Sequence, residues 1–204
     1  KSPRLVFICN PNNPTGSTLP PEEIQQLACA HPDTLFVIDE AYIQFVPDLS
    51  SCLTLDLPNL LILRSMTKDY AIAGLRLGYA VGSTGLIEAL AKVRPPWSVN
   101  AVAQDAGLAA LMDAGYLSQS LSRLQKAKTD FLHEFKSLGL HPIPSETHYF
   151  IIKVGDAAEF RRQLLAYKIQ VRDCASFGLP EYIRVVTRTP ADNAKLLSAL
   201  KEIA

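Results

Sequence analysis

Three short apolar segments of the chain are each followed by residues that can do chemistry. An asparagine-rich turn containing Asn13 follows the first segment, Asp39 ends the second, and Ser65 and Lys68 follow the third. A carboxylate can keep a ring nitrogen protonated, and a lysine becomes an amine nucleophile when desolvation or a nearby cation lowers its pKa. The amide and the hydroxyl add hydrogen-bonding groups. Any one of these polar ends is what a strand needs at a loop, but the residue types at all three ends complement one another chemically, which favours a shared ligand site.

Arg76 adds a cation to this set. It lies between small and apolar residues in the sequence Gly74–Gly78, a position that favours a fixed anionic partner. Pyridoxal phosphate would use all of these groups, because its aldehyde needs a lysine, its pyridine nitrogen a carboxylate, and its phosphate a hydroxyl and a cation. Each group alone has a plainer interpretation; Lys68, for example, would more often be a solvated lysine.

Four continuous apolar segments must position these groups. Each is short and bounded by turn residues, which is typical of strands buried on both faces of a parallel sheet. The pattern predicts an α/β fold with a mostly parallel sheet covered by helices, and in such sheets ligands bind at the carboxyl ends of the strands. The expected strands are Leu5–Cys9, Leu35–Ile38, Leu60–Leu63 and Leu77–Val81.

The character of the sequence changes after Thr84, where helical segments begin to alternate with a few short strands. This pattern predicts a small α+β domain in the C-terminal half, joined by a linking helix. The expected domains are residues 1–95 and 96–204. The expected elements after residue 84 are helices over 86–93, 100–114, 116–138 and 157–167, a helix capped by Thr189, and strands Tyr149–Val154, Ile169–Val171 and Tyr182–Val186.

Four short motifs in order give the chain a family resemblance. They are NPNNPTG at residues 10–16, DEAY at 39–42, SMTK at 65–68 and GLRLGY at 74–79. Together they resemble the class I and II aminotransferases of pyridoxal-phosphate fold type I, and the resemblance runs across essentially the whole chain. It implies that residues 1–95 are the C-terminal portion of an incomplete cofactor-binding large domain, and that 96–204 are the small domain.

The resemblance also implies catalytic roles. Lys68 would form the Schiff base with pyridoxal 5'-phosphate and later carry the proton. Asp39 would pair with the pyridinium nitrogen, and Tyr42 and Asn13 would hydrogen-bond the phenolic oxygen. The family further implies a cis peptide bond at Asn13–Pro14, which a proline-rich turn tolerates.

Anion-binding residues are implied in the same way. Ser65 and Arg76 would hold the cofactor phosphate. Arg184 lies within an apolar strand, where a guanidinium needs an anion; a structural pair with a carboxylate is the plainer interpretation, and in the family the matching arginine clamps the substrate carboxylate. Arg172 matches an arginine that contacts the phosphate in relatives handling phosphorylated substrates. We expect Arg188 to be solvated.

The pattern is most similar to the group of histidinol-phosphate aminotransferases and threonine-phosphate decarboxylases. We expect an aminotransferase that moves an amino group between an amino acid, or a phosphorylated amine of the histidinol-phosphate type, and a 2-oxo acid. A threonine-phosphate decarboxylase is the alternative, and the sequences RDCASF and PWSVN favour it slightly. The family pattern begins before Lys1, so we expect the C-terminal part of a longer, homodimeric enzyme. A non-catalytic truncated fragment serving as a scaffold is the second alternative.

Composition excludes several other classes. The 204 residues carry 20 basic and 20 acidic side chains, so the chain lacks the basic excess that nucleic-acid binding requires. No apolar run approaches the ~18 residues of a membrane span. The four cysteines have no metal-ligand spacing, so we expect no metal site, and free thiols favour a reducing, cytoplasmic location.

Overall fold

The computed structural model describes residues 3–203, which fold into two compact units. The first unit comprises Lys1–Asn13 and Thr18–Ser118, and the second comprises Pro14–Ser17 and Gln119–Ala204. The chain therefore enters the second unit briefly within the asparagine-rich turn. The expected domain boundary at 95/96 differs from the point at which the chain passes between these units, and the domain division of the protein stays a prediction.

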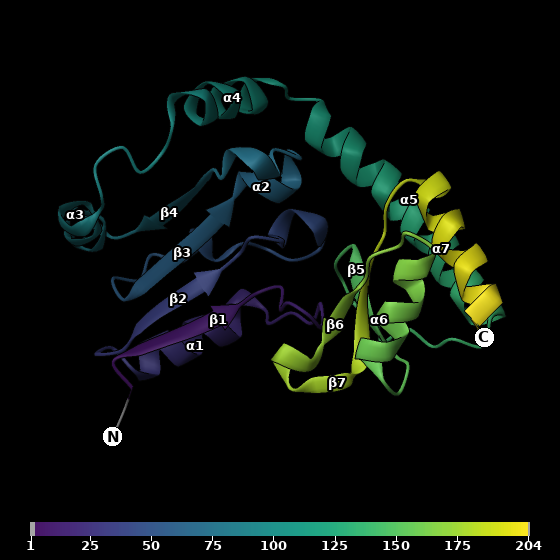
Figure 1. Ribbon diagram of the computed structural model, residues 1–204. Coiled ribbons are helices and arrows are strands. Elements are labelled where there is room, and N and C mark those ends of the chain that lie inside the picture. Colours follow the sequence, from purple (N-terminus) through teal and green to yellow (C-terminus); the bar gives the residue numbers. More distant parts are fainter. Residues whose placement is uncertain (1–2, 204) are drawn as a thin grey trace. The chain divides into compact units, whose positions relative to one another are not determined.

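The first unit is built on a four-stranded sheet in the order β1-β2-β3-β4 (Figure 1). The strands are β1 (Leu5–Cys9), β2 (Leu35–Asp39), β3 (Leu60–Ser65) and β4 (Gly78–Gly82). The first three strands run parallel, and β4 pairs antiparallel with β3. The predicted mostly parallel sheet is thus confirmed, and the carboxyl ends of three neighbouring strands lie at one edge.

One face of this sheet is covered by helix α1 (Pro21–Ala30). The helix begins with proline at its first position and two glutamates in its first turn, both of which favour a helix N-terminus. Its fully buried Ile24 belongs to a core cluster with Phe36 and Ile38 of β2 and Ile62 of β3. Burying a side chain of this size stabilises the fold by about 1.5–3 kcal/mol.

The other face of β1 differs from the expectation. Phe7 is 67% exposed and Leu5 46% exposed, so the prediction that this strand is buried on both faces was wrong. Val6 and Ile8 alternate with them and pack against the α1 cluster. Among residues 3–203, no element covers Leu5 and Phe7, and apolar periodicity alone cannot reveal which face of a strand lacks a partner. The expectation of burial on both faces was also wrong for β4, whose Tyr79 and Val81 are 47% and 38% exposed.

Short helices and two longer ones complete the first unit. Helix α2 (Met66–Asp69) follows β3 directly, and α3 (Thr84–Val93) and α4 (Ala101–Met112) follow β4. Single-turn 3-10 helices cover Ile43–Phe45 (η1), Cys52–Thr54 (η2) and Ala73–Leu75 (η3). Gly107 of α4 packs so closely on Leu77 that a Cβ at this position would overlap the leucine side chain.

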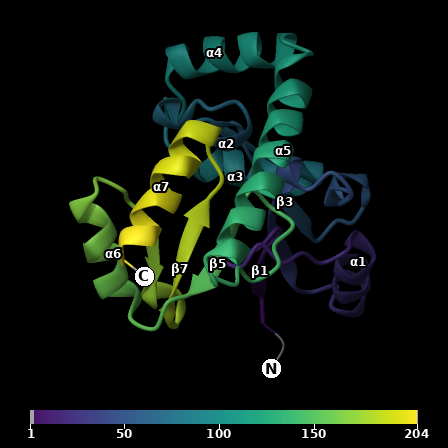
Figure 2. The same cartoon turned by 90° about the vertical axis from the view of Figure 1, so that its right-hand side faces the viewer.

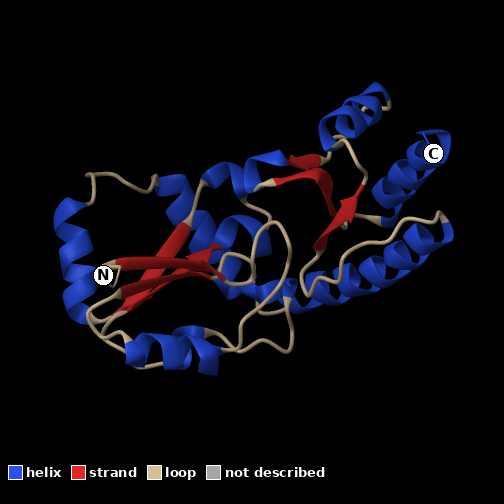
Figure 3. Cartoon of the chain, turned by 90° about the horizontal axis from the view of Figure 1, so that it is seen from below, coloured by secondary structure: helices blue, strands red, loops and turns tan. Residues whose placement is uncertain are grey.

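The second unit contains an antiparallel sheet in the order β5-β7-β6. Figure 2 shows its helices and strands, and Figure 3 marks the strands of each sheet in red. Its core contains an aromatic cluster in which the Phe135 ring packs edge-on against two others. The ring centroids of Phe135 and Phe131 are 4.7 Å apart, and those of Phe135 and Phe150 are 5.4 Å apart. The elements are α5 (Tyr116–Ser137), β5 (Tyr149–Lys153), α6 (Ala157–Ala166), β6 (Arg172–Cys174), β7 (Leu179–Val186) and α7 (Pro190–Ile203).

Two local expectations in this unit have opposite outcomes. Thr189 caps α7 as predicted, because its Oγ1 accepts a hydrogen bond from the backbone N–H of Asp192 at 3.3 Å. The strand expected at Ile169–Val171 was wrong, since β6 begins at Arg172. The backbone N–H of Ile169 instead donates to Leu164 O at the end of α6, after Lys168 adopts a left-handed conformation at φ 61°.

The cis peptide bond lies at Asn10–Pro11. The expected cis bond at Asn13–Pro14 was therefore wrong within the residues that the structure describes. Both are Asn–Pro bonds of the same turn, so the residue types alone do not show which of the two is cis.

Candidate active site

Strand alternation places the expected cofactor residues on one face of the first sheet. Asp39 at the end of β2 pairs with Leu63 of β3, and Ser65 lies two residues further along β3 on the same side. The neighbouring residues Glu40 and Arg64 project to the opposite face, where α1 packs. At the carboxyl edge, Asp39 and Ser65 therefore lie on one face of the sheet, and Glu40 and Arg64 lie on the other.

Asn10, the first residue of the NPNNPTG turn, holds the turn in place. Its side chain is 1% exposed and makes two hydrogen bonds with Leu19, accepting from the N–H at 2.9 Å and donating to the carbonyl at 2.9 Å. Its backbone N–H donates to Asp39 O at 2.9 Å, which ties the ends of β1 and β2 together. This amide is therefore structural, and Asn13 remains the candidate ligand-binding asparagine of the turn.

Asp39 and Asn13 both lie close to the thiol of Cys9. Burial raises the pKa of this thiol, a backbone hydrogen bond from Asn13 opposes the rise, and the negative charge of Asp39 adds to it. The half-buried carboxylate of Asp39 accepts a hydrogen bond from the backbone N–H of Ala41 at 3.0 Å through Oδ1. The turn after β1 and the end of β2 thus place the backbone of Asn13 and the carboxylate of Asp39 near the same thiol.

Lys68 and Tyr42 also lie near each other. The Nζ of Lys68 is 5.9 Å from the centroid of the Tyr42 ring, and the lysine is exposed. Lys68 lies on α2, which Ser65 caps by accepting from the backbone N–H of Thr67 at 3.3 Å. The hydroxyls of Ser65 and Thr67 are 2.7 Å apart. The lysine and the two hydroxyls are therefore held by one short capped helix.

Arg76 adopts a left-handed backbone conformation at φ 58°, which is unfavourable for a residue with a side chain. Its Nη1 donates to Ala73 O at 3.0 Å, and the residue is exposed. In the part of the chain that the structure describes, no carboxylate lies within ion-pair distance of it. The guanidinium can therefore meet an anion that comes from outside the chain.

The two expected substrate arginines lie side by side on neighbouring strands of the second sheet. Arg172 of β6 and Arg184 of β7 are register partners, so their side chains leave the same face. The guanidinium carbon of Arg184 lies 5.3 Å from the Tyr149 ring centroid. Arg172 donates to Ser176 Oγ at 2.8 Å and lies 5.5 Å from the Phe177 ring.

A cavity of about 560 Å³ in this unit is lined by both arginines and by Arg161 of α6 and Arg188. Asp173 and Asp192 also line it, and Asp192 is paired with Arg188 at 3.2 Å. Arg188 is exposed, as expected, but it is also ion-paired. Arg161 could not be predicted as a cavity residue, because an arginine on an amphipathic helix is usually solvated.

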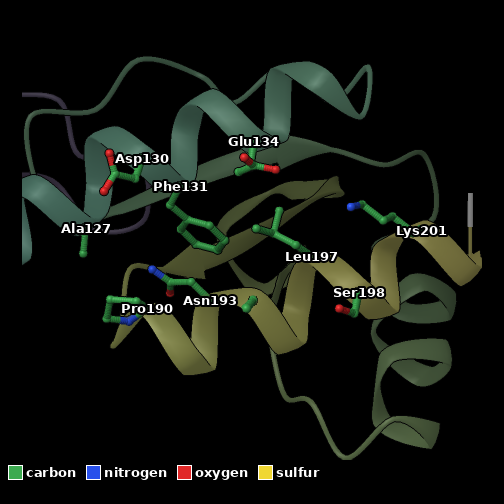
Figure 4. A pocket seen from close by; sticks show the side chains of 10 residues that line it. Ala127, Asp130, Phe131, Glu134, Pro190, Asn193, Leu197, Ser198 and Lys201 are labelled. Atoms are coloured by element: carbon green, nitrogen blue, oxygen red, sulfur yellow. The ribbon is translucent and has the colours of Figure 1, made fainter.

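A second hollow of about 350 Å³ lies between α5 and α7. In Figure 4, the apolar side chains of Phe131 and Leu197 lie between Asp130 and Glu134 on α5 and Lys201 on α7. Its two carboxylates outnumber its one lysine, which disfavours a phosphate or a carboxylate, whereas the four arginines of the first cavity outnumber its two aspartates. The arginine-lined cavity is therefore the better candidate for an anionic substrate.

The structure groups the expected residues by unit. It positions Asp39, Tyr42, Ser65 and Lys68 near the carboxyl edge of the first sheet, with Asn13 beside the Cys9 thiol, and Arg172 and Arg184 on the second sheet. Sequence reasoning missed the ion pair of Glu40 and Arg64, although both residues lie inside or beside the motifs that it used. No cluster of three potential metal ligands occurs within residues 3–203. No helix there is long and apolar enough to cross a membrane.

Comparison with known proteins relates this geometry to a family. The family model "Aminotransferase class I and II" matches residues 1–200. Histidinol-phosphate aminotransferase 1 of Thiobacillus denitrificans is 40% identical over 205 residues, which cover 98% of this chain and 53% of that protein. The chain spans about half the length of the curated relatives it matches.

Solved structures give the same fold. L-threonine-O-3-phosphate decarboxylase from Porphyromonas gingivalis superposes with a TM-score of 0.87 and 33% identity, covering 98% of this chain and 64% of that one. Histidinol-phosphate aminotransferase from Sinorhizobium meliloti, solved in complex with pyridoxal-5'-phosphate, has a TM-score of 0.82 and 29% identity, covering 98% and 58%. Both names agree with the group that the motifs resemble.

Proposed function

The chain belongs to the class I and II aminotransferases, and on that premise we propose that the protein is a pyridoxal-phosphate-dependent aminotransferase. The amino group would pass between a 2-oxo acid and an amino acid or a phosphorylated amine of the histidinol-phosphate type. The observation that carries this proposal is the grouping of Asp39, Tyr42, Ser65 and Lys68 at one edge of a parallel sheet.

The residues of this edge fit pyridoxal 5'-phosphate, the cofactor of the family. Asp39 offers a half-buried carboxylate, and Ser65 offers a hydroxyl that is already held by Thr67. Arg76 offers an exposed guanidinium without a carboxylate partner in the described chain, and Lys68 an exposed amine beside an aromatic ring. A carboxylate, a hydroxyl, a guanidinium and an amine are the four kinds of group that this cofactor requires.

Bound pyridoxal phosphate supplies an electron sink for the bonds at the amino-bearing carbon of the substrate. The chain would contribute binding and proton movement. Asp39 would hold a proton on the pyridine nitrogen, and Asn13 and Tyr42 would donate hydrogen bonds to the phenolic oxygen. Ser65 and Arg76 would bind the phosphate group. Lys68 would bind the aldehyde carbon and later take up and return the proton at the reacting carbon.

The second unit would bind the substrate anions. Arg172 and Arg184 leave the same face of the sheet, and two further arginines line the adjoining cavity. A planar guanidinium binds a carboxylate or a phosphate through two parallel hydrogen bonds. A substrate that carries a phosphate suits this concentration of positive charge.

Borohydride trapping tests the cofactor site. The purified chain is mixed with pyridoxal phosphate, reduced with borohydride, digested and mapped. We expect the label on Lys68, its loss in Lys68→Arg, and its retention in Lys92→Arg, a control at an exposed lysine of α3. An unlabelled Lys68, or equal labelling of all surface lysines, contradicts the site.

A threonine-phosphate decarboxylase is the second and weaker candidate: the chain is 33% identical to the Porphyromonas gingivalis enzyme, against 40% to a histidinol-phosphate aminotransferase. The two reactions are separated by their products. Amino transfer from histidinol phosphate to 2-oxoglutarate without release of carbon dioxide supports the aminotransferase. Release of carbon dioxide from threonine phosphate supports the decarboxylase and contradicts the first proposal.

We further propose that the protein acts as a homodimer in the cytoplasm. All four cysteines are free thiols, which suits a reducing compartment. Leu108, Leu111 and Met112 of α4 are 62–86% exposed, and such apolar side chains favour association with another protein surface. Light scattering of the purified protein at several concentrations would measure the oligomeric state.

A further inference from the structure

Glu40 is a fully buried carboxylate, and each of its two oxygens accepts a hydrogen bond. Its Oε1 accepts from the backbone N–H of Cys52 at 2.7 Å, and its Oε2 accepts from the hydroxyl of Ser51 at 2.6 Å. The same Oε2 lies 3.3 Å from Nη1 of Arg64, whose side chain is 8% exposed. Both charged side chains of this ion pair are buried.

Arg64 also acts on a second carboxylate. Burial raises the pKa of Asp69, and the positive charge of Arg64 opposes that rise. The Oδ1 of Asp69 is buried and makes no hydrogen bond within the described chain. Arg64 thus balances negative charge at the end of β2 and at the end of α2.

Stability alone does not account for this pair. Desolvating two charges is costly, and replacing a buried pair with apolar residues of similar volume is often neutral or stabilising. Removing a single partner, by contrast, leaves a buried charge unbalanced. A role in fixing geometry is the remaining physical advantage of the pair.

Each member of the pair is the chain neighbour of an expected cofactor residue. Glu40 follows Asp39, and Arg64 precedes Ser65, so the alternation of side chains places the ion pair on one face and the cofactor residues on the other. The backbone N–H of Glu40 also donates to Leu63 O at 2.9 Å. A displacement of either charged side chain would therefore rotate the backbone that carries Asp39 or Ser65.

We propose that Glu40 and Arg64 are positioning residues, whose ion pair behind the sheet fixes the ends of β2 and β3 and thereby orients Asp39 and Ser65 toward the cofactor. The inference rests on the proposed function for the identity of the ligand. The fixed geometry itself concerns only residues of this chain, and it can be measured without cofactor.

Two backbone amides report on the two side chains directly. The N–H of Ala41 donates to Asp39 Oδ1, and the N–H of Thr67 donates to Ser65 Oγ. Hydrogen exchange at these amides, followed by NMR in the absence of cofactor, measures how firmly each side chain is held. The amides of Val37 and Ile62 in the strand centres serve as internal references.

The variants separate positioning from folding. Glu40→Gln and Arg64→Met each leave one charge of the pair unbalanced and destabilise the fold. The double variant removes both charges of the pair and should melt closer to the wild type than either single variant, the remaining loss coming from Asp69, which no longer has Arg64 to balance it. Arg64→Lys restores the charge and should recover part of the loss. Neutralising the exposed pair of Lys153 and Glu181 with Lys153→Met and Glu181→Gln is the matched control.

In the double variant we expect the Ala41 and Thr67 amides to exchange at least tenfold faster, with the strand-centre amides unchanged. We also expect the dissociation constant for pyridoxal phosphate, from an absorbance titration, to rise about tenfold. If both amides of the double variant exchange at the wild-type rate, the inference is wrong. It is also wrong if the amides exchange faster but the affinity for pyridoxal phosphate is unchanged. If the wild-type chain binds no pyridoxal phosphate but the exchange rates rise as expected, the proposed function fails while the fixed geometry is supported.

Discussion

The hydroxyl of Ser145 occupies the space that a side chain at Gly16 would need. Gly16 is the last residue of the NPNNPTG turn and has φ 76°, and a Cβ there would overlap Ser145 Oγ. The carbonyl of Gly16 accepts from the backbone N–H of Glu146 at 3.2 Å. The turn that follows Asn13 is therefore pressed against the segment before β5.

Gly16→Ala should destabilise the chain for two reasons. A left-handed conformation costs roughly 1–2 kcal/mol for a residue with a Cβ, and overpacking against Ser145 adds about 1–3 kcal/mol. Gly155→Ala is the matched control, since Gly155 has φ 84° and no atom within 4 Å of the added Cβ. Urea denaturation should show the larger loss for Gly16→Ala; equal losses would mean that the contact with Ser145 is unimportant.

Arg76→Gly should stabilise the fold and weaken cofactor binding. Glycine adopts φ 58° without the penalty of about 1 kcal/mol, but it removes the guanidinium proposed for the phosphate. Lys168→Gly, at φ 61° in the second unit, should give the gain in stability without the change in affinity. Unfolding curves and a pyridoxal phosphate titration measure the two effects. Unchanged affinity in Arg76→Gly would remove Arg76 from the phosphate site.

Asp69 should make stability fall as pH rises above the ordinary range of an Asp carboxyl. Burial raises its pKa in the folded state, so between the unfolded and folded pKa values the native chain holds more protons than the unfolded chain. Its contribution is therefore fully present below the unfolded pKa and is lost as pH rises through the folded pKa. Asp69→Asn should flatten this part of the profile of unfolding free energy, and Asp105→Asn, at an exposed position, should not.

Arg172→Gln and Arg184→Gln should weaken anion binding to the cavity of the second unit. A hydrogen bond to a charged group contributes about 1.5–3 kcal/mol, which corresponds to an affinity loss of about 10- to 150-fold for each arginine. Inorganic phosphate is the probe, and calorimetry measures its binding. Arg123→Gln on the exposed side of α5 is the control, and an equal loss there would indicate general electrostatic attraction only.

Most of the first sheet could be predicted from the sequence because its strands are continuous apolar runs ended by polar turns. The expected Leu5–Cys9, Leu35–Ile38 and Leu60–Leu63 agree with β1, β2 and β3 to within two residues. The exposure of Phe7 could not be predicted, since burial depends on what covers the face. The strand expected at Ile169–Val171 was wrong because the backbone N–H of Ile169 donates to Leu164 O at the end of α6 and is not available for a sheet hydrogen bond. An apolar pattern does not reveal this hydrogen bond.

The candidate site could be predicted through its motifs, whereas the support behind it could not. Asp39 and Ser65 lie at strand ends, where polar residues attract notice. Glu40 and Arg64 occupy the same motifs, but only their burial and the 3.3 Å separation reveal that they form a pair.

The unpaired edge of β1 affects how the stability of the variants must be measured. β1 is an edge strand of the sheet within residues 3–203, and it presents backbone hydrogen-bonding groups together with the exposed Phe7. A second chain can pair with such an edge, and association by mass action raises the apparent melting temperature as protein concentration increases. Unfolding free energies of the variants are therefore comparable only at one fixed, low protein concentration.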